Sequence, residues 1–481
     1  MKKVVIIGAG ISGLSTALSL EEEAAKRGVA LEITLIERNK RVGGNIMTER
    51  ADGFLIEGGP DCFLSEKPWA MELCRKIGLG EKLLTTNEKN KKTFVLSRGK
   101  LHELPEGVIL MVPTKITPLL FSRLLSLRGK LRMGLEFFIP RKKGNRDESL
   151  GDFVRRRLGQ EALDKIAEPL VAGVHAGDPD TMSVRASFPK FVEMETEYGS
   201  MIRGMLARMR QMREGRKSAG KAGTPKGGAK RPKVTMFMTL KEGLSELVDT
   251  IVSRFTMTTI KMSLTVKEVC AQSTGYAVRI EGGETIDCDA VIIAAPAYAA
   301  SAIIKGLDRD LSERLLTIPY VSTATVSLGY KKRDVKHPLN GFGFVVPKTE
   351  NRRIMAASWV SVKFKHRAPT NSVLIRCFVG GAKNEELVFR SDEEIIRMVR
   401  DELRDIMGIV AEPVVVRLFR WHKAMPQYTI GHLDRIKMIE ESTGSHPGLY
   451  LTGGAYGGIG ISDCVRMGGE TAVKVMDHLT Q

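Results

Sequence analysis

Near its beginning the chain carries a glycine pattern that suits the binding of phosphate groups. The run Gly8-Ala9-Gly10-Ile11-Ser12-Gly13 follows the apolar residues 4–7 and precedes a helical pattern that continues to about Arg27. Gly8 permits a tight turn after a strand, Gly10 lets the backbone approach a pyrophosphate, and Gly13 lets the helix pack against the strand. The first turn of such a helix offers free N–H groups and a positive dipole to phosphates. The pattern therefore predicts a dinucleotide-binding turn.

An acidic residue and a second pair of glycines follow, as this type of site requires. Glu37 ends the predicted strand 31–36, where its carboxylate can accept hydrogen bonds from ribose hydroxyls. Its charge also argues against a 2′-phosphate, and hence against NADP. The next motif is Arg41-Val42-Gly43-Gly44-Asn45, in which two glycines let a loop lie directly against a ligand. The order of these motifs favours FAD over NAD.

The other end of the chain repeats the arrangement of strand, glycine loop and helix. The apolar residues 449–451 lead into the glycine-rich stretch 453–460, and a final helix is predicted from about Asp463. This loop can cap a second end of the ligand, such as the flavin pyrimidine and the pyrophosphate. Because similar patterns lie at both ends of the chain, we expect a discontinuous nucleotide-binding domain with another domain inserted between its parts.

The order of motifs resembles that of the flavoprotein superfamily of amine oxidases, phytoene desaturases and porphyrinogen oxidases. Two further stretches, 153–159 and 168–179, look like the signature of the oxygen-dependent protoporphyrinogen and coproporphyrinogen oxidases, which are FAD enzymes of haem biosynthesis. The second stretch, Glu168-Pro169-Leu170-Val171-Ala172-Gly173-Val174-His175-Ala176-Gly177-Asp178-Pro179, is the more specific. Further matches in the same order lie at 341–347, 367–369 and 378–381, so the resemblance extends from the first strand to the final helix.

The resemblance implies an α/β fold with three parts. They are a discontinuous Rossmann-like FAD-binding domain of the amine-oxidase type, an inserted α+β substrate domain and a helical subdomain. We expect the FAD-binding domain to comprise residues 1–88, 235–297 and 440–481. The substrate domain is expected at 89–108 and 298–439, and the helical subdomain at 109–234. Within the last, the pattern from Ser149, a candidate N-cap, to 167 predicts one continuous helix.

The resemblance also implies the residues that hold the cofactor. FAD is expected to contact the two glycine turns, the strand ends and a third loop: Gly8, Ala9, Gly10, Ile11, Ser12, Gly13, Glu37, Arg38, Gly44, Asn45, Gly59, Pro60, Asp61, Cys62, Val266, Gly454, Ile459, Gly460 and Ile461. A tryptophan often stands in this family where Asn45 does, so the contact there is expected to differ in kind.

Fewer residues can be carried over for the substrate. The porphyrinogen pocket is expected to include Gly173, whose backbone approaches the macrocycle, apolar walls from Val345 and Phe378, and Ser358 on a matching strand. Lys92 would face a propionate, although a lysine is a point charge where some relatives carry the bidentate fork of arginine. No catalytic residue is expected from the chain, because the flavin carries the chemistry. No metal site is expected, because no pair of the eight histidines shows the HExxH spacing or a similar one. His175 is interpreted as structural.

The implied reaction is a six-electron oxidation in three two-electron steps, with molecular oxygen reoxidising the flavin. The substrate is either protoporphyrinogen IX, giving protoporphyrin IX, or coproporphyrinogen III, giving coproporphyrin III. A homodimer is a further family expectation. Another FAD amine oxidase or a carotenoid desaturase is the alternative enzyme, although the stretch 168–179 argues against both. A non-catalytic membrane or nucleic-acid adaptor on a flavin fold is the alternative from another class.

The net charge of +18 is confined to two segments. Residues 115–146 carry nine basic residues and one acid, 203–233 carry eleven and one, and the remainder is neutral. The second segment has no aromatic residue for base stacking, so no nucleic-acid partner is expected, and its part 214–233 is predicted to be a flexible loop. The first segment combines basic residues with leucines at helical spacing over 111–140. That pattern fits an interfacial helix on an anionic membrane, or a helix that packs on the core with a wet basic side.

Cysteine usage and hydropathy suggest a compartment. The six cysteines are scattered and form no CxxC pair, which favours reduced cytosolic thiols. No signal peptide and no apolar stretch long enough to span a bilayer is visible. We therefore expect a cytoplasmic protein. The family that it resembles often binds membranes peripherally through the region of 115–146, which adds the expectation of a position on the inner face of the cell membrane.

Overall fold

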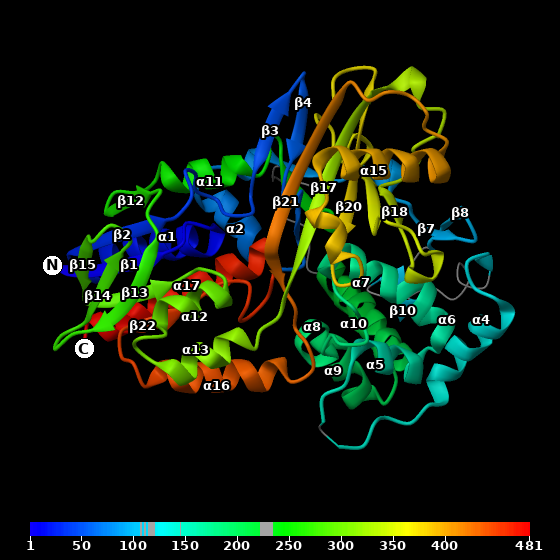
Figure 1. Cartoon of the computed structure of the whole chain (residues 1–481). Helices are drawn as coiled ribbons and strands as arrows, with labels where there is room; N and C mark the ends of the chain where they lie inside the picture. The colour runs from blue at the N-terminus through cyan, green and yellow to red at the C-terminus, as the bar shows by residue number, and fades with distance from the viewer. Residues whose placement is uncertain (106–107, 110–111, 114–120, 145, 222–233) are drawn as a thin grey trace.

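The computed structural model describes residues 1–105, 108–109, 112–113, 121–144, 146–221 and 234–481 (Figure 1). Three parts can be distinguished in it. A parallel sheet with its helices forms one end of the molecule, a long mixed sheet stands beside it, and a group of helices lies below the mixed sheet (Figure 1). No described helix combines the length and the apolar character needed to cross a lipid bilayer.

The first part is built on a five-stranded sheet in which every neighbouring pair is parallel. Its strands lie in the order β12 (Thr258–Met262), β2 (Leu31–Glu37), β1 (Lys2–Ile7), β16 (Ala290–Ile293) and β22 (Leu449–Leu451). Alternate residues of β1 pack on opposite faces, Val4 and Ile6 on one and Val5 and Ile7 on the other. The predicted continuous apolar run is therefore a strand buried on both sides.

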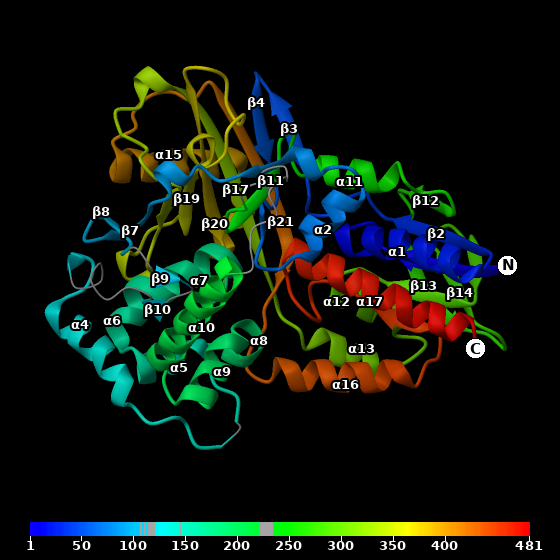
Figure 2. The same cartoon turned by 180° about the vertical axis from the view of Figure 1, so that it is seen from behind.

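Helices from the two ends of the chain cover one face of this sheet. α1 (Ile11–Arg27) and α17 (Ile461–Leu479) lie side by side, as Figure 2 shows. A Cβ on Gly468 of α17 would lie 3.0 Å from Ser15 Cβ of α1, so the glycine permits the close approach. The other face is covered by β13 (Val266–Ala271), β14 (Tyr276–Ile280), β15 (Thr285–Cys288), α12 (Ala297–Ile304) and α13 (Arg309–Leu316).

The second part is a seven-stranded sheet with two unlike faces. Its order is β21 (Val415–Pro426), β17 (Tyr320–Lys331), β20 (Ser372–Gly380), β19 (Ala356–Trp359), β18 (Gly343–Val345), β7 (Thr93–Ser97) and β8 (Lys100–Glu103). One face is apolar and packs against α15 (Asp392–Met407), with Val326, Ile375 and Cys377 in its core. Along β20 the alternate residues Arg376 and Phe378 belong to the opposite face, which meets the loop after β4 (Phe54–Glu57).

The third part is helical. It comprises α4 (Leu127–Gly134), η3 (Leu135–Phe138), α5 (Leu150–Arg157), α6 (Gln160–Ala162), η4 (Leu163–Ala167), α7 (Glu168–His175), α8 (Val184–Ser187), α9 (Pro189–Tyr198) and α10 (Met201–Lys221). Smaller elements join the parts: β3 (Thr48–Ala51), β5 (Phe63–Leu64), α2 (Trp69–Lys76), η1 (Gly80–Lys82), β6 (Leu83–Thr85), η2 (Glu88–Asn90), β9 (Val108–Ile109), β10 (Val112–Pro113), β11 (Phe237–Leu240), α11 (Ser245–Val252), η5 (Lys332–Asp334), η6 (Lys348–Glu350), α14 (Val360–Lys363), η7 (Glu385–Phe389) and α16 (His432–Gly444).

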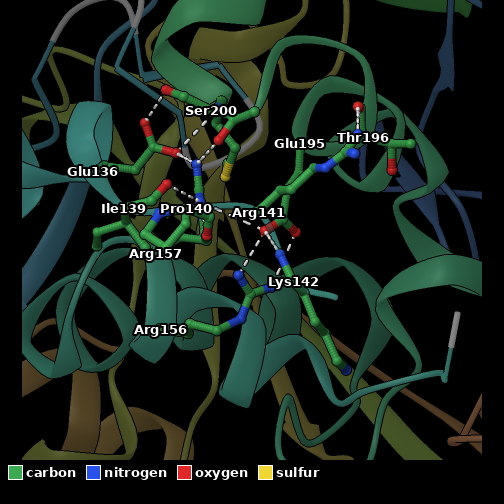
Figure 3. A network of polar contacts seen from close by, with 12 residues as sticks. Glu136, Ile139, Pro140, Arg141, Lys142, Arg156, Arg157, Glu195, Thr196 and Ser200 are labelled. Carbon is green, nitrogen blue, oxygen red and sulfur yellow. Dashed lines mark hydrogen bonds and ion pairs between the residues drawn. The ribbon is translucent and has the colours of Figure 1, made fainter. Parts of the chain in front are cut away.

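A buried ionic network holds the helical part together (Figure 3). The fully buried Glu136 of η3 pairs with the fully buried Arg157 of α5. Its carboxylate also accepts from Ser200 Oγ at 2.6 Å and from the Met201 N–H at 2.8 Å, at the start of α10. Glu195 of α9 binds Arg156 through both carboxylate oxygens, at 2.6 and 2.9 Å. Negative charge at the start of α10 complements the helix dipole.

The predicted helix over 149–167 is wrong in its length. Ser149 is the N-cap, and its Oγ accepts from the Asp152 N–H at 2.9 Å, but α5 ends at Arg157. Gly159 then adopts a φ of 93°, which a helix cannot include, and a Cβ there would lie 2.6 Å from Arg132 Cγ. The chain continues through α6 and the π-helix η4 before α7 begins.

Two further predictions in the helical part need correction. The predicted flexible loop 214–233 is helical in its first part, because α10 continues to Lys221, and 222–233 lie outside the described residues. The predicted helix over 111–140 is shorter, since residues 112–113 form strand β10 and α4 begins only after the N-cap Ser126. Residues 114–120 of that prediction lie outside the described part of the chain.

Candidate functional site

The first glycine turn lies between β1 and α1, and its shape depends on the missing side chains. Gly8 has a φ of 104°, and a Cβ there would lie 3.0 Å from Ala294 O of the neighbouring strand end. A Cβ on Gly13 would overlap with the Gly8 carbonyl. Helix α1 begins at Ile11, so its first N–H groups are directed at the turn. The turn thus has the form required to approach a pyrophosphate.

Glu37 lies at the end of β2, beside this turn, and is buried. Its Oε2 accepts from the Ala9 N–H at 2.9 Å, and its Oε1 accepts from the backbone and side-chain N–H groups of Asn39 at 2.9 and 2.6 Å. These bonds orient the carboxylate at the carboxyl end of the strand, where it was predicted to bind a ribose. Arg38, the next residue, is exposed, and Val266 at the start of β13 lies nearby because Leu264 N donates to Glu37 O at 3.1 Å.

The second glycine loop packs on the first. Gly43 N donates to Ala9 O at 2.7 Å, and a Cβ on Gly44 would lie 3.1 Å from Gly10 Cα. The Arg41 guanidinium holds the loop by donating to the carbonyls of Val42, Gly44 and Ile46 at 3.2, 2.6 and 3.0 Å. Two backbone segments without side chains therefore face each other and form a cradle. Any side chain at these glycines would fill the space between the segments. These residues fit the diphosphate of FAD.

A third loop, Gly58-Gly59-Pro60-Asp61-Cys62, connects the glycine turns to the seven-stranded sheet. Gly58 O accepts from Thr325 Oγ1 at 3.0 Å, Trp421 Nε1 at 2.9 Å and Arg376 Nη2 at 3.1 Å, so side chains from three adjacent strands converge on one carbonyl. Arg376 Nη2 also donates to Gly59 O. A Cβ on Gly59 would overlap with Asn45 O, and this brings the predicted contacts Gly44, Asn45 and Gly59 together.

The same loop contains a largely buried charge cluster. Lys363 Nζ lies 3.0 Å from Asp61 Oδ2 and 3.4 Å from Cys62 Sγ, and Cys62 Sγ donates to Asp61 Oδ1 at 3.0 Å. Burial opposes ionisation of Asp61, but the cations Lys363 and Arg376 outweigh it and hold the pKa of Asp61 well below its ordinary range. Burial raises the pKa of the Cys62 thiol to about 12, so the thiol is protonated at neutral pH.

The C-terminal glycine loop is held by one tyrosine. Tyr428 donates from its hydroxyl to Gly454 O at 2.7 Å and accepts from Gly458 N at 2.7 Å. Its ring stacks on the buried His432 with centroids 3.9 Å apart. The loop ends at Gly460, where Ile461 begins α17, so a second helix N-terminus lies beside the first. The predicted contacts Gly454, Ile459, Gly460 and Ile461 all belong to this loop and to the first residue of α17.

Three of the predicted substrate residues lie together on the seven-stranded sheet and α7. Val345 is paired with Ala356, and Ala356 with Phe378, across three adjacent strands. A Cβ on Gly173 of α7 would lie 3.3 Å from Val345 Cγ1 and 3.8 Å from Ala356 Cβ. The Phe378 ring lies 4.9 Å from the Arg376 guanidinium. The helix backbone and an apolar strand surface therefore face each other with little between them.

The other two predicted substrate residues lie at the far side of this surface. Ser358 Oγ donates to Phe342 O at 3.3 Å, and Lys92 O accepts from Phe342 N at 2.7 Å. The side chain of Lys92 is half-exposed and forms an ion pair with Glu103 at 2.7 Å. His175 lies near Phe188, and burial together with Lys67 lowers its pKa to about 4, so the imidazole is neutral at pH 7.

Several residues of the site were not predicted from the sequence. Thr325, Lys363, Arg376, Trp421 and Tyr428 all contact the loops described above. The sequence does single out Arg376, because this residue interrupts the apolar stretch 373–379. A charged residue inside a buried strand is rare unless it is paired, so its presence could have indicated a role in the site. The others carry no comparable local signal.

Comparison with known proteins agrees with this geometry. The profile of the flavin containing amine oxidoreductases matches residues 11–476. The coproporphyrinogen III oxidase of Bacillus subtilis is 37% identical over 99% of this chain and 98% of its own. The chloroplastic protoporphyrinogen oxidase of Oryza sativa is 32% identical over 99% and 88%.

The similarity extends to solved structures. One from Exiguobacterium sp. 255-15, provisionally assigned as a protoporphyrinogen oxidase, has a TM-score of 0.83 and 32% identity over 100% of this chain and 99% of its own. A putrescine oxidase shares the fold alone, with a TM-score of 0.68 and 17% identity over 99% of both chains. The glycine cradle, the two helix N-termini and the match over nearly the whole length lead to one conclusion: the chain belongs to the flavin containing amine oxidoreductase family.

Proposed function

We propose that this protein is an FAD-dependent porphyrinogen oxidase of haem biosynthesis and that coproporphyrinogen III is its substrate. The full-length similarity to the Bacillus subtilis coproporphyrinogen III oxidase carries the proposal. Relatives of the same name from Staphylococcus aureus and Propionibacterium freudenreichii, at 30% and 29% identity, support the choice of substrate. Protoporphyrinogen IX is the alternative, supported by the plant relatives.

The residues of the chain bind, orient and shield in this proposal. A bound flavin supplies the acceptor for two electrons at a time, so that three rounds remove the six electrons that separate a porphyrinogen from a porphyrin. Gly173 lets the macrocycle lie close to the α7 backbone, and Val345 and Phe378 exclude water from one side of it. His175 is not charged at neutral pH, which is consistent with a structural role.

The propionates of the substrate would be met by Lys92. In the structure this lysine pairs with Glu103 and is half-exposed, so a propionate would exchange with a carboxylate already present. Such a contact is worth little in water, since exposed ion pairs contribute about 0–1 kcal/mol. Lys92 is thus proposed as a weak contact at the mouth of the pocket.

The test uses the purified protein and two substrates. Its absorbance spectrum should show bound flavin, and anaerobically prepared coproporphyrinogen III should become fluorescent when oxygen is admitted, faster than protoporphyrinogen IX does. Consumption of dissolved oxygen in the same reaction tests oxygen as the final acceptor, and gel filtration tests the proposed homodimer. Flavin-loaded protein that does not exceed the uncatalysed rate with either substrate would refute the proposed activity.

The proposal includes peripheral binding to an anionic membrane through the helical part. Large apolar side chains are exposed along one stretch: Phe121 (82%), Leu127 (83%), Leu131 (69%) and Phe138 (75%). Exposed basic residues accompany them: Arg123, Arg128, Arg141 and Lys143. Apolar and basic groups together suit a lipid surface, where each basic residue contributes roughly 1 kcal/mol.

Co-sedimentation with lipid vesicles tests this surface. Wild-type protein should bind vesicles that contain anionic lipid and should bind neutral vesicles less, and the double substitution Leu127→Ser with Leu131→Ser should reduce binding at least about tenfold. Leu316→Ser is the matched control, because Leu316 is an exposed leucine (60%) on α13. Equal binding by the double variant and the control would exclude this part of the chain as the membrane contact.

A further inference from the structure

Arg376 lies between the cofactor side and the substrate side of the site. It is 3% exposed, although it carries a permanent charge, and burial of an unpaired guanidinium is costly. Asp61 and Glu57 are its acidic neighbours and only partly offset that cost, because burial lowers the pKa of Arg376 despite them. If the residue at this position served only to stabilise the strand, an apolar side chain would do so at a lower cost in free energy than a buried charge. The retained charge therefore calls for a specific partner.

On the cofactor side that partner is the turn Gly58-Gly59. The Nη2 atom of Arg376 donates to both carbonyl oxygens of the turn. The Gly58-Gly59 turn packs directly on the loop Gly44-Asn45, because a Cβ on Gly59 would overlap with Asn45 O. Gly44 of that loop lies against Gly10. An uninterrupted series of backbone contacts therefore leads from one guanidinium to the phosphate-binding turn.

On the substrate side the partner is Phe378. The guanidinium lies 4.9 Å from the centre of the Phe378 ring, within the range of a cation–π contact. Phe378 is paired with Ala356, and both Ala356 and Val345 approach Gly173 of α7. A movement of Arg376 would thus be transmitted to the wall on which the proposed macrocycle rests.

We propose that Arg376 is a positioning residue that joins the FAD-binding turn to the substrate wall and thereby sets both the affinity for FAD and the KM for the porphyrinogen. The inference rests on the proposed function, which supplies the substrate. The planar, donor-rich head of arginine suits the task, because it can donate to two carbonyls and lie against a ring at once. The ammonium of a lysine keeps the charge but offers no such plane.

The experiment compares Arg376→Gln, Arg376→Lys and the control Arg420→Lys in the full chain. Arg420 is a matched residue because it also donates to two backbone carbonyls, those of Val388 and Arg390, at 2.9 and 2.6 Å, and it lies on β21 of the same sheet. We measure the Kd for FAD by titrating the flavin-free protein, following flavin fluorescence, and KM and kcat from porphyrin fluorescence at saturating FAD.

Arg376→Gln should raise both the Kd for FAD and the KM at least about tenfold, since hydrogen bonds from a charged donor are lost. Arg376→Lys should restore part of both, and Arg420→Lys should change neither. The effect on KM should exceed that on kcat. In a double-mutant cycle with Phe378→Leu the two effects on KM should be non-additive, because the arginine acts through the ring.

Wild-type values of either constant in Arg376→Gln would overturn the proposal, as would a lower melting temperature with both constants unchanged. Additive effects in the cycle would overturn the link through Phe378. Should Arg376→Gln fail to fold, the Kd for FAD and the KM of Arg376→Lys test the proposal instead, and wild-type values of either constant would overturn it. Failure of the proposed function is recognised separately, because the wild type would then bind FAD without oxidising either porphyrinogen. In that case the FAD titration alone decides whether Arg376 positions the cofactor turn.

Discussion

Two buried charge clusters differ in what they bind. In the helical part, Glu136, Glu148 and Glu195 face Arg156 and Arg157, so that three acids meet two bases. The acceptors around them are mostly within the same part, such as Ile139 O, which Arg157 binds at 2.9 Å. At the site, Lys363 pairs with Asp61, and Arg376 has both Asp61 and Glu57 as acidic neighbours. Arg376 donates to the carbonyls of a turn from another part of the molecule.

The difference suggests that the helical cluster stabilises the fold, whereas the site cluster positions the loops of the site. The helical cluster joins η3, α5, α9 and α10 to one another, and each of its arginines pairs with a carboxylate of the same part. The site cluster connects segments about 300 residues apart in sequence and ends on backbone that is proposed to touch the cofactor. Damage to the first should therefore unfold the protein, and damage to the second should change binding.

The largest effect is expected for Arg157→Met. Glu136 would remain fully buried without its cation, and loss of one partner of a buried pair costs about 3–5 kcal/mol. Urea unfolding followed by circular dichroism should show this loss in the free energy of unfolding. The Kd for FAD of the folded fraction should stay at its wild-type value.

Arg309→Met is the matched control. Arg309 is exposed and pairs with Glu313 one helical turn away, so its loss should cost less than about 0.5 kcal/mol. An equal loss in the two variants, or a weakened affinity for FAD in Arg157→Met, would remove the distinction between the two clusters.

A smaller effect is expected for Asp61→Asn, with a defined pH dependence. The substitution removes the carboxylate that pairs with Lys363 and leaves Arg376 with Glu57 as its acidic neighbour, so it should cost about 2–3 kcal/mol at pH 7. The lowered pKa of Asp61 means that its stabilisation is complete above the ordinary value of 3.8 and is lost as pH falls below it.

The cost of Asp61→Asn should therefore be the same at pH 8 and pH 5 and should shrink only below about pH 4. Melting temperatures across this range provide the measurement, with Asp310→Asn as the control, because Asp310 is an exposed residue of α13. A cost that already declines between pH 8 and pH 5 would mean that Asp61 is not held ionised by its two cations.

The smallest effect is expected for Thr325→Val. One of three donors to Gly58 O is removed while Trp421 and Arg376 remain, so the cost should be about 0.5–1.5 kcal/mol. The Kd for FAD should rise less than threefold, in contrast to Arg376→Gln. An effect of Thr325→Val on FAD affinity as large as that of Arg376→Gln would show that Gly58 O, and not the arginine bridge to Phe378, controls the turn.

The elements that could be predicted from the sequence are those whose structure is determined by neighbouring residues in the chain. Strand β1, helix α1 and the glycine turns follow from short patterns, and α1 ends at Arg27, where the helical pattern was predicted to end. The loop after Arg157 was missed because a positive φ at Gly159 is decided by packing against Arg132 of another helix, which no local pattern reveals.

The site was predictable where glycine is required and unpredictable where a distant side chain acts. Gly8, Gly13 and Gly44 are marked by spacing alone, whereas Tyr428 and Thr325 contact loops that lie far from them in sequence. A tyrosine or threonine in a strand is ordinary, and only the fold shows that its hydroxyl meets a glycine carbonyl. The carried-over contacts with FAD and substrate stay predictions until the variants above are measured.

The pairing of α1 with α17 has a consequence for the time at which the protein becomes active. A ribosome releases the first glycine turn early, but the helix that lies against it starts only at Ile461. β22 and the loop held by Tyr428 also follow the first turn by a long stretch of chain, so they are not yet present when that turn is made. The nascent chain therefore holds β1 and α1 without their final neighbours for some time, and FAD can be enclosed only after α17 has been made.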